Sequence, residues 1–199
     1  MQKWQSQWRW MKPTMIFCLI LVPIMGTIMC LFISGRVVHS YVGFAFDSAE
    51  RLYVGKNTGI EVYENGNKIR TIRPPSSRSY TFTISDDRIV ASTGQSVRIM
   101  DLEGELIDQK TDDGSTFRKM YANSSKFVTL SGRQYSKGSI FGYYRIIRDD
   151  GECIYSMPLF DYIVNVLFEA CGVSTVIFVI TLLVKLKIIR IGKPHDLKA

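Results

Sequence analysis

The sequence predicts a membrane-anchored, mainly-β protein in which two transmembrane helices flank an antiparallel β domain of three repeats. The first observation is a pair of long apolar blocks, at 14–34 and 163–184. The second is the stretch between them, 37–160, where short alternating polar and apolar segments are separated by turn residues. The third is a strand–glycine turn–strand pattern that recurs within this stretch.

The first apolar block, Thr14–Ile33, carries no charged residue over its 20 positions. At about 1.5 Å rise per residue, a helix of this length crosses the hydrocarbon core of roughly 30 Å. A cleaved secretory signal is the rival interpretation, but its apolar core spans about 7–15 residues and ends at a small-residue cleavage site. Because Ile33-Ser34-Gly35-Arg36 is a poor site of this kind, the sequence favours an uncleaved anchor over 14–34.

The second block contains one charged residue, Glu169, four positions after Asn165. Two interpretations stay open. Both side chains sit at the outer membrane interface, where a carboxylate reaches water, or they form a polar contact with another membrane helix. Ser174, at i+4 from Ala170, would help in the second case by allowing close approach.

The net charge of +7 is concentrated at the two ends of the chain, whereas 37–160 holds 16 basic and 15 acidic residues. Cytoplasmic flanks are enriched in Lys and Arg. We therefore expect a multi-pass protein of the cell membrane with cytoplasmic ends, 1–13 and 185–199, and an extracytoplasmic domain between the helices. Trp4, Trp8 and Trp10 are expected to anchor the first segment in the lipid headgroup layer.

The central stretch divides into repeats at about 41–73, 80–110 and 117–157. Each ends in a tight hairpin around Gly66, Gly104 or Gly151, and these glycines are 38 and then 47 positions apart. A strand before each hairpin starts near a basic residue, at Arg51, Arg88 and Lys126. The longer second step predicts an insertion around 133–140.

This pattern resembles the blades of NHL-like or YVTN-like β-propellers. The resemblance implies a scaffold for binding and transfers no functional residue. Propellers have at least four blades, and this chain has three. We expect two chains to complete a six-bladed ring, or another subunit to cover the open sheet faces. A compact meander or sandwich that needs no partner is the alternative.

Chemistry-bearing motifs are sparse. The neutral domain argues against nucleic acid as a partner, and no metal-ligand spacing, phosphate loop or nucleophile–base pair occurs. The sequence therefore predicts a non-enzymatic binding or scaffolding protein without a cofactor, whose partners are the bilayer and a protein or a second copy. The expected insertion offers a binding loop of basic and aromatic residues, Arg133, Tyr135, Lys137 and Phe141. The alternative function is an accessory subunit of a membrane transport or secretion complex, assembled through Asn165, Glu169 and Ser174.

Overall fold

The computed structural model describes residues 2–73 and 80–185, with side chains for 15–73 and 80–184. The chain divides into two compact units. We call them the helical unit, Met1–Ile33 with Ile163–Ala199, and the β unit, Ser34–Tyr162. The basic tail after residue 185 lies outside the described residues.

The helical unit contains α1 (Gln2–Ile33) and most of α3 (Leu159–Lys185). Met15–Ile33 and Leu159–Val184 are long and apolar enough to cross a membrane. Two aromatic contacts join the helices: Phe17 stacks on Phe178 at 4.4 Å, and Phe32 meets Phe168 edge-on at 5.3 Å. Because the later residue of α1 meets the earlier residue of α3, the two helices pack antiparallel.

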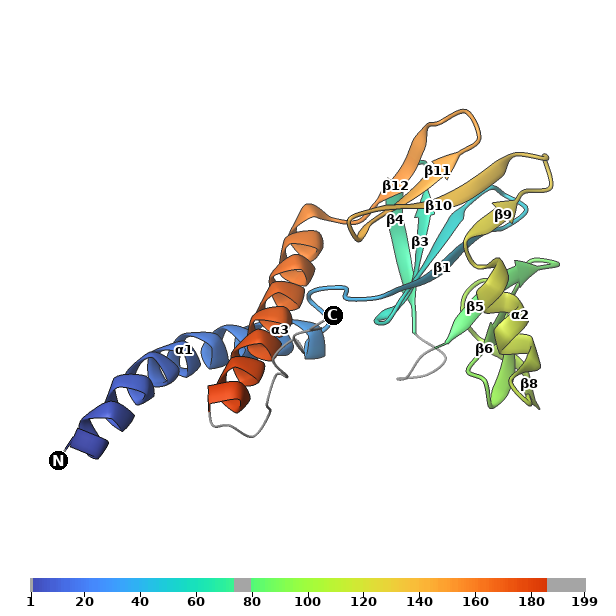
Figure 1. Cartoon of the computed structure of the whole chain (residues 1–199). Coiled ribbons are helices and arrows are strands. Elements are labelled where there is room, and N and C mark those ends of the chain that lie inside the picture. Colours follow the sequence, from blue (N-terminus) through green and yellow to red (C-terminus); the bar gives the residue numbers. More distant parts are fainter. Residues whose placement is uncertain (1, 74–79, 186–199) are drawn as a thin grey trace, which may run out of the picture. The chain divides into compact units, whose positions relative to one another are not determined.

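The β unit consists of three four-stranded antiparallel sheets and one short helix, and Figure 1 shows the sheet of β5, β6 and β8 beside α2, apart from the other two sheets, which overlap in this view. This confirms a mainly-β segment with three antiparallel sheets between two apolar helices. No strand of one sheet pairs with a strand of another in the described residues, which favours blades over a single meander.

Sheet 1 contains β1 (Tyr41–Phe46), β2 (Leu52–Lys56), β3 (Gly59–Glu64) and β4 (Asn67–Ile72). Sheet 2 contains β5 (Thr81–Ser85), β6 (Arg88–Ser92), β7 (Ser96–Met100) and β8 (Leu106–Thr111). Sheet 3 contains β9 (Lys126–Val128), β10 (Gln134–Ile140), β11 (Tyr143–Arg148) and β12 (Cys153–Ser156).

The three expected hairpin glycines each connect the last two strands of a sheet. Gly66, Gly104 and Gly151 have φ angles of 77°, 94° and 88°, which residues with a Cβ rarely adopt. At Gly104 an added Cβ would also lie 2.5 Å from Cγ2 of Ile72, so this turn packs directly on sheet 1. Each of these glycines therefore lies in the turn before the last strand of its sheet.

The start of the third repeat was predicted wrongly. Residues Ser115–Asn123 form α2, a nine-residue helix, and the first strand of sheet 3 is β9, which begins at Lys126. Arg51 directly precedes the second strand of sheet 1, and Arg88 is the first residue of the second strand of sheet 2. The basic residue that directly precedes the second strand of sheet 3 is Arg133. The extra nine positions between Gly104 and Gly151 thus correspond to α2 in length, and 133–140 is no insertion.

Sheet 1 lies between the other two sheets, so the order in space differs from the order in the chain. One face of sheet 1 packs on sheet 2 in a core that includes Tyr53, Ile60 and Ile89. The opposite face packs on sheet 3 in a core that is rich in aromatic rings, including Phe46 and Tyr144. Consequently the outward faces of sheets 2 and 3 are those without a neighbouring sheet.

Candidate functional site

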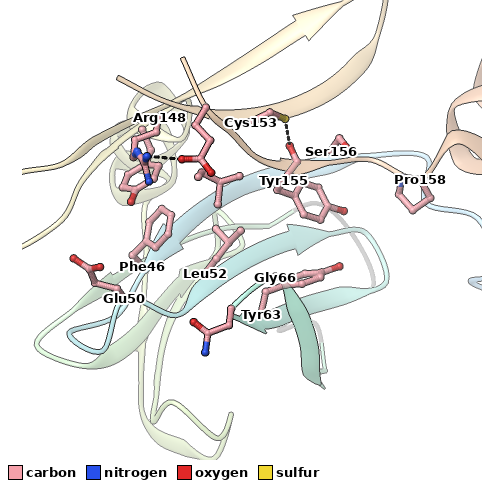
Figure 2. A pocket seen from close by; sticks show the side chains of 14 residues that line it. Phe46, Glu50, Leu52, Tyr63, Gly66, Arg148, Cys153, Tyr155, Ser156 and Pro158 are labelled. Carbon is pink, nitrogen blue, oxygen red and sulfur yellow. Dashed lines mark hydrogen bonds and ion pairs between the residues drawn. The ribbon is translucent and has the colours of Figure 1, made fainter. Parts of the chain in front are cut away.

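A cleft of about 650 Å³ opens between sheets 1 and 3, at the turns that end their strands. Figure 2 shows the hairpin of β3 and β4 on one side and the hairpin of β11 and β12 on the other. Its volume falls within the range of about 300–1,000 Å³ that is common for ligand sites. The lining residues are Phe46, Glu50, Leu52, Tyr63, Asn65, Gly66, Tyr135, Arg148, Glu152, Cys153, Ile154, Tyr155, Ser156 and Pro158.

The aromatic wall of the cleft is held by a buried ion pair behind it. The Tyr63 hydroxyl donates a hydrogen bond to Oε2 of Glu61 at 2.6 Å, and Lys56 forms an ion pair with the same carboxylate. The Lys56 ammonium also lies 5.7 Å from the ring centre of Tyr155, a second wall residue. The side chains of Lys56 and Glu61 are only 4% and 13% exposed.

Burial and hydrogen bonding determine the protonation states of Glu61, Tyr63 and Tyr155. Burial opposes ionisation of Glu61, but hydrogen bonds from Lys56, Lys68 and Tyr63 outweigh it and lower the Glu61 pKa to about 2. Burial, followed by the hydrogen bond to Glu61, raises the pKa of Tyr63 above its ordinary value. Burial also raises the pKa of Tyr155. At neutral pH the wall therefore presents neutral phenols above a fixed carboxylate.

The rim of the cleft carries both signs of charge. Arg148 donates from Nε to Oδ2 of Asp150 at 2.8 Å and forms an ion pair with Glu152. The thiol of Cys153 is exposed and donates to the carbonyl oxygen of Tyr155 at 3.3 Å. A rim of paired charges around aromatic rings suits the binding of a mixed polar and apolar ligand.

One end of the cleft is closed by a contact between two equivalent turns. Glu50 accepts hydrogen bonds from Ser131 at 2.7 Å and from Arg133 at 2.9 Å, which joins sheet 1 to sheet 3. The backbone of Glu50 has φ 60°, and the equivalent residue of the sheet 3 turn is Gly132 with φ 82°. Glu50 thus adopts a backbone conformation that glycine adopts more easily, and its carboxylate contacts the turn of the neighbouring sheet.

The four residues of the expected binding loop do not form a loop. Residues Gln134–Ile140 are strand β10, paired with β9 on one side and β11 on the other. Tyr135 is buried, with its ring 4.2 Å from that of Phe46, and it lines the cleft from inside. Arg133 pairs with Glu50, whereas the ammonium of Lys137 lies 5.2 Å from the ring of Tyr144. Phe141 lies at the other end of β10 from Arg133, so the four residues do not converge.

The expected helix contacts are distributed along α3. The Ser174 hydroxyl donates to the carbonyl oxygen of Ala170 in its own helix at 2.7 Å. Glu169 is exposed and Asn165 is half-buried. Since Phe168 meets Phe32 near the end of the apolar block of α1, Glu169 lies at the depth where that block ends. The expected anchors Trp4, Trp8 and Trp10 belong to α1, but their side chains lie outside the described residues.

Sequence reasoning missed the buried pair of Lys56 and Glu61. A signal was present, since Lys56 ends the otherwise uncharged segment Leu52–Lys56 and a two-residue turn separates it from the next strand. The pair becomes visible once register is known, because β2 and β3 pair antiparallel across this turn.

No family model and no curated protein sequence matches the chain. Among solved structures, the chain is similar to a protein of unknown function from Bacteroides caccae, at 13% identity and a TM-score of 0.29, over 60% of this chain and 46% of that one. It is also similar to a virginiamycin B lyase from Staphylococcus aureus solved with quinupristin, at 12% identity and a TM-score of 0.33, over 61% and 42%. A third is the Pan2 WD40 domain from Neurospora crassa, at 17% identity and a TM-score of 0.31, over 60% and 38%. The chain spans less than half the length of each of these proteins.

Proposed function

We propose that this protein is a non-enzymatic, membrane-anchored binding protein that presents the β unit outside the cytoplasm, and that the cleft between sheets 1 and 3 takes a segment of a protein partner. The antiparallel packing of α1 and α3 supports this topology, because it puts the start of α1 and the end of α3 on the same side of the helical unit. We further infer that the three sheets are propeller-type blades similar to NHL-like or YVTN-like repeats.

The cleft is the observation that carries the proposal. Its walls are sheet hairpins whose conformation is fixed by turn glycines and by the buried pair, so the site is formed before a ligand binds. Aromatic rings such as Tyr63 and Tyr155 supply apolar contact area, and the rim supplies both signs of charge. This combination is typical of surfaces that recognise polypeptide, where aromatic residues form the centre and charges form the rim.

The absence of catalysis is proposed on the chemistry of the lining residues. Arg148 and Glu152 neutralise each other, and the hydroxyl of Tyr63 is engaged by a buried carboxylate. The cleft lining contains no histidine among the described residues, and Cys153 has no base in contact with it there. Nucleophilic catalysis needs such a base within hydrogen-bond reach.

Site-specific photocrosslinking in the native membrane tests the binding role. A benzophenone amino acid replaces Glu152, which follows the hairpin glycine of sheet 3 and lines the cleft. The matched control is Glu105, which follows the equivalent hairpin glycine of sheet 2, outside this cleft. We expect one adduct of defined mass from position 152 and none from 105. Equal adducts from both positions, or none from either, would refute a binding cleft.

The outward face of sheet 3 supports a second copy or another subunit as a partner. Val128 is 60% exposed on this face, because its neighbour Phe127 packs into the core on the other side of the sheet. An accessory subunit that assembles through its helices is separated from this proposal by exchanging both helices for unrelated spans. A protein that only presents the β unit should keep its function after the exchange, whereas an accessory subunit should no longer assemble with its complex.

A further inference from the structure

The hairpin between β10 and β11 has an apolar and strained tip. Phe141 is 92% exposed and Ile140 is 57% exposed. Phe141 and Gly142 have φ angles of 50° and 81°, the pattern of a two-residue turn that normally selects Asn-Gly or Asp-Gly. A bulky residue is an outlier at positive φ. The tip thus retains both backbone strain and exposed apolar surface, and neither contributes to the core.

The tip lies beside the start of α3. Ile140 pairs with Tyr143 to close the turn, and the ring of Tyr143 is 5.1 Å from that of Tyr162 in the first turn of α3. The next residue, Tyr144, accepts a hydrogen bond at its carbonyl oxygen from the backbone of Met157, at 2.9 Å. These contacts all lie within the β unit. They place the hairpin tip at the end of sheet 3 from which the chain leaves toward the second apolar span.

The surroundings of the tip have the composition of a membrane interface. The first residues of α3, Leu159 and Phe160, are 64% and 58% exposed. Arg145 lies over the ring of Tyr143, 5.0 Å from its centre. Exposed aliphatic and aromatic side chains next to tyrosines and a guanidinium match the headgroup layer, where amphipathic rings and basic groups concentrate.

We propose that the tip of the β10–β11 hairpin inserts Ile140 and Phe141 into the outer leaflet, at the boundary between headgroups and acyl chains. This inference rests on the proposed membrane anchoring, because the tip lies beside the first turn of α3, whose residues Leu159–Val184 are long and apolar enough to cross a membrane. The occupant of this surface is lipid. The hairpin then forms a third attachment of the domain besides its two helices, and it fixes sheet 3, and with it one wall of the cleft, against the membrane.

Depth-dependent fluorescence quenching tests the insertion. The full chain, with Trp4, Trp8 and Trp10 replaced by Phe, is reconstituted in phosphatidylcholine vesicles that contain lipids brominated at a shallow or a deep acyl position. Single tryptophans are introduced by Phe141→Trp or Ile140→Trp at the tip, and by Phe178→Trp within the span as a reference. The matched control is Leu130→Trp, since Leu130 is 91% exposed but lies beyond the other end of β10, about 20 Å away at 3.3 Å per residue.

We expect the tip tryptophans to lose most of their emission with the shallow quencher and less with the deep one, while the Leu130→Trp protein keeps its emission. If only the Phe178→Trp protein is quenched, the anchoring holds and the insertion is overturned. If the Phe178→Trp protein is not quenched, the anchoring itself fails. Equal quenching at Leu130 and at the tip would mean that the whole sheet contacts lipid, and it also overturns a specific role for the tip. Hydrogen exchange across β10 and β11 verifies the sheet in every variant.

Discussion

Replacing Glu61 by glutamine tests how far the buried ion pair stabilises sheet 1. The Glu61 pKa falls from 4.5 to about 2 in the folded protein, and each pKa unit corresponds to about 1.4 kcal/mol, so ionised Glu61 contributes about 3 kcal/mol. Little of this is lost to solvent screening, since the two side chains are 4% and 13% exposed. Removing one partner of a buried pair costs about 3–5 kcal/mol, in agreement.

The assay is hydrogen exchange of the β2 and β3 amides in the full chain, reconstituted in nanodiscs at neutral pH. We expect Glu61→Gln to lower their opening free energy by about 3 kcal/mol. The control Glu103→Gln removes an ion pair with Arg70 whose glutamate is 63% exposed, and it should change the value by less than about 1 kcal/mol. The double variant Lys56→Met with Glu61→Gln should recover most of the lost opening free energy, because no buried charge is then left unpaired. Unchanged exchange in the Glu61→Gln protein would refute the reasoning.

The same carboxylate sets an acid dependence. Because its pKa is lowered by folding, its stabilisation is complete above pH 4.5 and is lost as the pH falls from 4.5 toward about 2. The wild-type protein should therefore lose stability over this window, and the Glu61→Gln protein should lose about 3 kcal/mol less. A urea titration at each pH, followed by near-ultraviolet circular dichroism, measures both slopes.

Three further outcomes are expected. Gly104→Ala should destabilise the domain by about 1–3 kcal/mol in urea titrations, because its Cβ would meet Ile72 at 2.5 Å; the same change at Gly66 meets nothing within 4 Å and should cost only the backbone strain of about 1 kcal/mol. A membrane-impermeant maleimide applied to intact cells should modify Cys153 and leave the three cysteines of the apolar spans unmodified; mass spectrometry that finds Cys153 unmodified would contradict the topology. Absorbance at alkaline pH should show that the tyrosines with raised pKa ionise only when the domain unfolds, since folding favours their neutral form and stability falls as the pH rises past about 10. These tyrosines are Tyr41, Tyr53, Tyr63, Tyr80, Tyr144 and Tyr155.

The elements that depend on local chemistry could be predicted from the sequence. Long uncharged apolar runs specify helices whatever surrounds them, and glycine or Asn-Gly turns fix a hairpin because few residues adopt positive φ. Gly66, Gly104 and Gly151 therefore marked the end of every sheet. The helix α1 begins well before the predicted span, at Gln2, and it runs through Pro13, a residue that usually ends or kinks a helix.

The start of the third repeat could not be found in this way. Lys126-Phe127-Val128 has the basic–apolar pattern of Arg51-Leu52-Tyr53, whereas the true equivalent, Arg133-Gln134-Tyr135, places a polar residue at the second position. The helix α2 gives a weak signal as well, because its N-cap residue is Gly114 and the carboxylates that accept from its first N–H groups, Asp112 and Asp113, stand before that glycine in a segment typical of a turn. Aligning the repeats on Lys126 moved one strand of sheet 3 into an apparent insertion.

The cleft was not predictable because it depends on the order of the sheets in space. Tyr63 and Tyr155 could be assigned to the core from their alternation, but only the packing of sheet 3 on sheet 1 brings them to one wall. Lys56 and Glu61 likewise meet through strand register. Turn chemistry is local in sequence, whereas the choice of sheet neighbours is decided by which faces bury the most apolar surface.

The central place of sheet 1 has a mechanical consequence. The chain leaves α1 and enters β1, and it leaves β12 and enters α3, so sheets 1 and 3 each connect directly to an apolar helix. Sheet 2 has no such connection and rests on sheet 1 through contacts such as that of Phe82 with Gly55. A pulling load applied to sheet 2 is transmitted through that interface before it reaches the helices. The Phe82 interface should therefore separate first, while the two sheets that form the cleft stay together.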